Sequence, residues 1–229
     1  MKKTLFFNLL VLSGFVLNSC AHSTIPQIQI PEQKGELDVA ASLGIGTSGL
    51  HANAIYALSD KICLQGATNF LGTTFYREAG LGLKTRAGKR LWSFTYGRAE
   101  YRYNPLVYGG TYGIYEYTGH FDKYAAALNV RFSPEAGLVG RLAYLNGRET
   151  GENECLVCRP YYHLPFSRLY FEPVVYFKLG KRKRLLLSAT GRLQLSAKGK
   201  TDKDYAFAMS YFQYNVGYMF GMFKKPRLE

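Results

Sequence analysis

The sequence is poor in cysteine and in acidic residues, and it lacks a long apolar run after residue 20. Only four of the 229 residues are cysteines, and three of those follow residue 20, so at most one disulfide can form within that part of the chain. A membrane-spanning helix needs about 20 consecutive apolar residues. The absence of such a run after residue 20 excludes a membrane-spanning helix in that part of the chain. No motif typical of an enzyme active site stands out.

The shortage of acidic residues makes the chain strongly basic. There are 16 acidic residues against 29 lysines and arginines, and the formal net charge is +13. Removing residues 1–19, which contain Lys2 and Lys3, leaves a charge of +11. A charge of this size favours anionic partners such as lipid headgroups, acidic glycans or nucleic acid.

The N-terminus is basic first and apolar afterwards. Two lysines precede the apolar run 4–17, and small residues follow it, which is the pattern of a secretory signal peptide. An exported protein meets little nucleic acid, so the basic charge points to lipids or to other envelope molecules.

The stretch Leu17-Asn18-Ser19-Cys20 ends this region and resembles the lipobox of bacterial lipoproteins. An aliphatic residue stands three positions before the cysteine, serine precedes it and alanine follows it. The asparagine is a less usual residue at its place. The resemblance implies cleavage after residue 19 and covalent lipid on Cys20, with no other cofactor. The predicted segments are a signal peptide at 1–19, a lipidated cysteine and linker at 20–35, a β-domain at 36–223 and a basic tail at 224–229.

From residue 36 onward, apolar and polar residues alternate with a period of two, which indicates β-strands. After Gly97 the alternation slips, which predicts a bulge there. We expect long loops at 104–119 and 149–167. The predicted strands cover 37–45, 50–58, 62–70, 74–85, 91–103, 123–132, 138–148, 169–179, 185–196 and 205–223.

The number, length and alternation of these strands predict an all-β fold, an antiparallel up-and-down transmembrane β-barrel of about ten strands. Long connections follow strands five, seven and nine, and short turns follow strands two, four, six and eight, as in outer-membrane barrels. Eight or twelve strands stay open, and so does a soluble, tethered barrel of lipocalin type with an inward apolar face. The chain thus resembles a bacterial outer-membrane lipoprotein with a barrel domain, at the level of a class.

Charged residues of both signs fall on the predicted inner face. Because unpaired buried charge is costly, we expect them to form a salt-bridged network in the lumen, or else to line a small polar pore. The predicted network is Asp38, Arg98, Glu100, Arg131, Arg141, Glu172 and Arg192, with Glu78, Arg102 and Lys178 also facing inward.

Two groups of residues are candidates for metal binding, redox chemistry or catalysis. Cys155 and Cys158 form a Cys-X-X-Cys pair in a predicted loop; a disulfide in an oxidising compartment is favoured over a redox pair or a zinc site with His163, since a fourth ligand is missing. His120 and Asp122 lie near the rim, where envelope hydrolases carry their catalytic groups, but no serine motif accompanies them. We predict no catalytic residue and no metal.

The predicted function is that of a non-enzymatic structural, accessory or binding component of the Gram-negative outer membrane, anchored by its lipid. A small passive channel, an embedded lipid hydrolase, acyltransferase or protease, and a soluble ligand-binding barrel are the alternatives. The expected partners are outer-membrane lipids, lipopolysaccharide among them, and an envelope protein, because basic residues gather at the predicted short turns.

Overall fold

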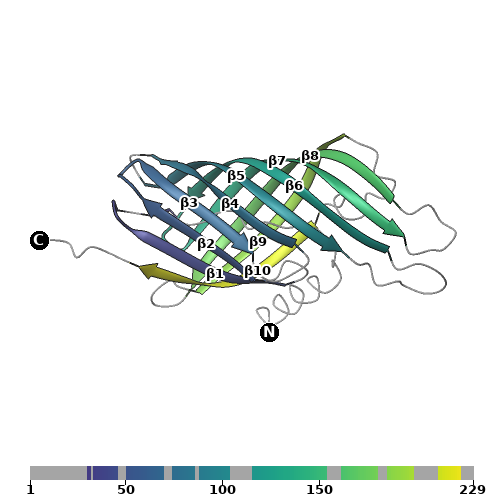
Figure 1. The fold of residues 1–229 in the computed structure, drawn as a ribbon. Coiled ribbons are helices and arrows are strands. Elements are labelled where there is room, and N and C mark those ends of the chain that lie inside the picture. Colours follow the sequence, from purple (N-terminus) through teal and green to yellow (C-terminus); the bar gives the residue numbers. More distant parts are fainter. Residues whose placement is uncertain are drawn as a thin grey trace, which may run out of the picture.

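The computed structural model describes residues 30–31, 33–45, 50–69, 74–85, 88–103, 115–153, 161–179, 185–198 and 211–222. Within them, ten β-strands follow one another in chain order (Figure 1). No helix in this part of the chain has the length and apolarity needed to cross a membrane. The strands are β1 Leu37–Ile45, β2 Leu50–Ala57, β3 Ile62–Asn69, β4 Thr74–Lys84, β5 Arg90–Tyr103, β6 Tyr115–Arg131, β7 Ala136–Asn153, β8 Tyr161–Leu179, β9 Leu185–Lys198 and β10 Tyr211–Met222.

Strands β1 to β9 form one continuous, curled antiparallel sheet in which each strand pairs with its neighbours in sequence. Strand β10 lies between the two edge strands of this sheet. It pairs with β1 from Leu37↔Met222 to Ile45↔Tyr214 and with β9 from Tyr211↔Arg192 to Tyr218↔Leu185, so the ladder returns to its first strand. The predicted all-β class and the antiparallel up-and-down strand order are confirmed.

Tight turns join the strands at the end where β1 begins. The Ser59 hydroxyl accepts a hydrogen bond from the Ile62 N–H at 3.0 Å, and Ser133 plays the same role between β6 and β7. Gly88 has a φ of +62° in the β4–β5 turn, a conformation that glycine adopts without a steric penalty. The hydroxyl groups of Ser59 and Ser133 thus satisfy backbone N–H donors that would otherwise be left without partners at the strand ends.

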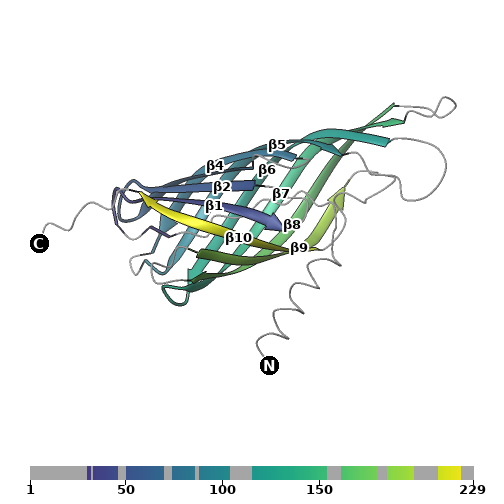
Figure 2. The ribbon, with the colours of Figure 1, turned by 90° about the horizontal axis from the view of Figure 1, so that it is seen from below.

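At the opposite end, β6, β7 and β8 reach past the shorter strands β1 to β3 (Figures 1 and 2). The predicted loops were therefore too long, because residues 115–119, 149–153 and 161–167 belong to strands. These residues carry no regular apolar alternation. Without that alternation, the period of the sequence gives no strand signal.

The predicted bulge at Gly97 is wrong. The β5 ladders to β4 and β6 run without interruption through Gly97, and the one register shift in the described ladders lies at Leu169/Tyr170, between β8 and β9. Glycine is needed at 97 for another reason: an added Cβ would lie 2.8 Å from the Arg77 carbonyl oxygen and 2.5 Å from the Tyr76 hydroxyl.

The residues before β1 pack inside the barrel at its short-turn end. Ile30 is buried, and Lys84 donates a hydrogen bond from Nζ to the Pro31 carbonyl at 3.2 Å. The predicted linker 20–35 thus ends in a packed segment, while 1–29 and 224–229, with the predicted signal peptide, Cys20 and the basic tail, lie outside the described residues. Ile30 shares its cluster with inner-face residues Ile55, Ala57, Cys63 and Leu91.

Candidate functional site

A cluster of five charged side chains lies buried inside the barrel, and we call it the inner charge cluster. Its residues come from five different strands. Four of them are at most 2% exposed, and the fifth, Glu78, is 7% exposed. The cluster consists of Glu78 on β4, Lys123 on β6, Arg141 on β7, Glu172 on β8 and Arg192 on β9.

Glu172 is the centre of the cluster. Its Oε1 accepts hydrogen bonds from Arg192 Nε at 2.9 Å and Nη2 at 2.6 Å. Its Oε2 lies 3.1 Å from Lys123 Nζ and 3.7 Å from Arg141 Nε. One carboxylate therefore faces three cations, and charge-assisted bonds of this kind are the strongest that side chains form.

Glu78 completes the cluster on the far side of the lumen. Its Oε2 accepts hydrogen bonds from Arg141 and from the Tyr76 hydroxyl. The contacts therefore lead from β4 through Arg141 and Glu172 to Arg192 on β9. Strands β4 and β9 are five positions apart in either direction around the strand order, so this chain of contacts crosses the lumen.

Small side chains on the inner face make room for these long ones. Ala125 and Ala143 are buried beside the cluster, and Ala127 lies directly opposite Arg141 on the neighbouring strand. The Arg192 guanidinium lies 4.8 Å from the ring centre of Tyr170, a favourable cation–π distance. The lumen is thus packed by side chains at this level, which is the expected state of a narrow barrel.

The structure brings Arg141, Glu172 and Arg192 of the predicted network together. Asp38 and Arg131 are half-buried on the inner-face parity near the short turns, where Arg131 donates to the Gly88 carbonyl at 3.1 Å. Glu78 joins the cluster, and Lys178 lies over the Tyr176 ring at 6.0 Å. The Arg102 side chain lies outside the described part.

The placement of Arg98 and Glu100 in the lumen is wrong. Both are exposed on the outer face of β5, because the strand keeps its phase through Gly97. Lys123, by contrast, was not predicted as a member of the network. Its signal was present in the sequence, since it has the same parity as Arg131 within one uninterrupted strand.

The outer face of the barrel carries a wide apolar belt. Large apolar side chains are exposed on each of the ten described strands, and the outward-facing residues of β8 from Leu169 to Leu179 include no charged side chain. Ten residue steps at roughly 3.3 Å, on a strand tilted by about 40°, give a height of ~25 Å. The exposed apolar set includes Leu64, Leu81, Trp92, Phe94, Leu142, Val175, Phe177 and Leu193.

Three tyrosines mark one border of this apolar belt. Tyr96, Tyr124 and Tyr144 lie directly opposite one another on β5, β6 and β7, and each is about half exposed. The next outward-facing residues toward the long-strand end are polar on five consecutive strands. They are Arg77, Arg98, Asp122, Asn146 and Ser167.

The remaining candidate residues form no reactive group in the described structure. His120 and Asp122 face outward on the same strand, and the Asp122 carboxylate accepts the Tyr96 hydroxyl at 2.8 Å. Cys63 is buried with a free thiol, while Cys155, Cys158 and the side chain of His163 lie outside the described part. Among described residues, no three His, Cys, Asp or Glu side chains gather closely enough to hold a metal ion.

No family model matches this chain, and no curated protein matches its sequence significantly. The features of this chain that bear on its function are the charged side chains buried on the inner face of the sheet and the apolar side chains exposed on its outer face.

Proposed function

We propose that this protein is a lipid-anchored β-barrel of the Gram-negative outer membrane, with a sealed lumen and a structural or binding role. One observation carries this proposal: the barrel exposes an apolar belt and buries a cluster of charged side chains. Soluble proteins rarely expose contiguous apolar patches larger than a few hundred Å², whereas membrane barrels have an outward apolar band about 25 Å tall with aromatic residues at its borders.

The same observation argues against a soluble, tethered barrel of lipocalin type. In such a barrel the apolar side chains would face a ligand inside, and the charged side chains would face water. Here Arg141, Glu172 and Arg192 face inward, while Trp92 and Phe94 are about half exposed outside.

The inner charge cluster argues against a passive channel. It crosses the lumen with side chains that are almost completely buried, and Ile30 packs inside the barrel at the short-turn end. We therefore expect no measurable ion conductance from the purified protein in planar bilayers. Replacing both Glu78 and Arg141 by alanine, which removes the contact that crosses the lumen, should produce conductance steps. Conductance of the same size in both proteins would contradict a sealed lumen.

The lipid anchor would belong to the leaflet at the short-turn end. Leu37 and Met222 are paired at this end, so both ends of the barrel domain emerge there. Cys20 precedes Ile30 by ten residues, a reach of at most ~36 Å. Exposed Lys89 and Arg90 lie at the same end, where they would face anionic headgroups. The longer strands β6 to β8 would then project from the other surface, where they are available to an envelope partner.

A gel experiment on isolated outer membranes tests the proposal. Cells labelled with a clickable palmitate should give a labelled band that migrates differently before and after boiling, because a folded barrel resists detergent at room temperature. The Cys20→Ala variant should keep the heat shift and lose the label. A labelled band without a heat shift, released once its lipid is removed, would show a tethered soluble domain instead.

A further inference from the structure

Two arginines face each other across β4 and β5 on the outer face of the barrel. Arg77 and Arg98 are direct cross-strand partners, and both are exposed. Side chains in such positions have Cβ atoms only about 5 Å apart, and like charges there destabilise a sheet. A repulsive pair at this place is explained if an anion bridges the two guanidinium groups.

Two acidic residues lie near this pair and offset part of its charge. Asp122 lies opposite Arg98 on β6, but its carboxylate accepts the Tyr96 hydroxyl. Glu100 lies opposite Phe75, and the Arg77 guanidinium lies 4.4 Å from the Phe75 ring centre. No acid in the described part of the chain forms an ion pair with either arginine.

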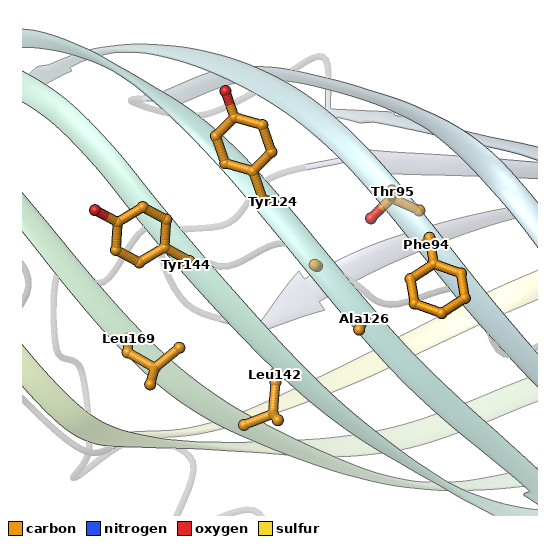
Figure 3. A pocket seen from close by; sticks show the side chains of 8 residues that line it. Phe94, Thr95, Tyr124, Ala126, Leu142, Tyr144 and Leu169 are labelled. Atoms are coloured by element: carbon orange, nitrogen blue, oxygen red, sulfur yellow. The ribbon is translucent and has the colours of Figure 1, made fainter.

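Two shallow apolar grooves lie on this face, and the first of them begins next to the arginines. The first, of about 470 Å³, lies over β4 and β5 beside Ala79, Leu81 and Phe94. The second, of about 410 Å³, lies over β6, where Ala126 leaves a gap between Phe94, Tyr124, Leu142 and Tyr144 (Figure 3). The outward side chains of β5 separate the two grooves, and Arg98 follows Tyr96 on that same face.

From this arrangement we propose that Arg77 and Arg98 bind the phosphate of a lipid whose acyl chains lie in the two grooves. The inference rests on the proposed membrane-spanning barrel and adds a ligand class to it: an acyl lipid with a phosphate monoester, in the leaflet at the long-strand end. Guanidinium groups bind phosphate through paired hydrogen bonds. The small residues Ala79 and Ala126 leave room for chains below the headgroup level.

Native mass spectrometry of the detergent-extracted full protein tests this site. The probes are phosphatidic acid and phosphatidylcholine with identical acyl chains, together with inorganic phosphate. We expect phosphatidic acid to bind about tenfold more tightly than phosphatidylcholine, because its phosphate monoester carries more negative charge and no choline group. The double variant Arg77→Gln, Arg98→Gln should lose this preference and keep its binding to phosphatidylcholine.

Two further variants separate charge from shape. Arg148→Gln removes an exposed arginine from the outer face of β7 and should leave the preference unchanged. Ala79→Phe fills the first groove and should weaken both lipids. Equal binding of the two lipids by the wild type, an equal loss with Arg148→Gln, or free phosphate binding as tightly as phosphatidic acid would each overturn the lipid site.

The heat shift on a gel keeps the two proposals distinguishable. Each variant should retain the shift, which shows that it folds as a barrel. A wild-type protein without the shift would contradict the membrane barrel itself. A shifting wild type without a preference for phosphatidic acid would contradict only the lipid site.

Discussion

Replacing Glu172 with glutamine is expected to lower the free energy of unfolding by about 3–5 kcal/mol, the usual cost of removing one partner from a buried ion pair. Glu172 holds Lys123, Arg141 and Arg192, so the variant would leave three buried cations with the single carboxylate of Glu78. Glutamine keeps the size of the side chain, which confines the effect to charge and hydrogen bonding. Urea titration in lipid vesicles, followed by the fluorescence of Trp92, measures the change.

Glu100→Gln is the matched control, because Glu100 is an exposed carboxylate on the outer face of β5. Its expected effect is within about 0.5 kcal/mol, as for most surface substitutions. A second variant, in which Glu172 and Arg192 are both replaced by leucine, should recover part of the loss since it removes charges of both signs. Equal stabilities of the Glu172→Gln and Glu100→Gln proteins would show that the inner charge cluster contributes nothing to stability.

For the inner charge cluster, the alternation along each strand predicts which side chains face inward but not which of them are in contact. Arg141, Glu172 and Arg192 each alternate with apolar neighbours, so the period of two is enough to predict that they share a face. Which of them meet is set by the curvature of the sheet. Arg141 reaches Glu78 three strands away, and no local pattern contains that contact.

Arg98 and Glu100 show where the same reasoning fails. Their predicted place in the lumen depends on a change of phase at Gly97, because a lipid-facing position of a membrane barrel is expected to be apolar. That rule holds only between the two membrane surfaces. Beyond Tyr96 the outer face of β5 becomes polar without any change of phase.

A charged residue placed in the apolar belt of the outer face is expected to have the second large effect on stability. Leu142→Arg is expected to lower the free energy of unfolding in vesicles by about 2–4 kcal/mol, because a charge inside the hydrocarbon region of a barrel is costly. Leu142 is surrounded on the outer face by apolar neighbours, with Ala126 and Phe171 opposite it. The single tryptophan, Trp92, reports unfolding from within the same belt.

Asn146→Arg provides the comparison, since Asn146 lies on the same face of β7 but beyond the tyrosine border. An arginine near the membrane surface costs about 0–1 kcal/mol, so the two variants should differ by at least about 1 kcal/mol. The side chains of Leu142 and Asn146 are both exposed in the isolated barrel. If water surrounded the whole barrel, both arginines would have small effects, within about 0.5 kcal/mol, and a small effect of Leu142→Arg would contradict a membrane location for this surface.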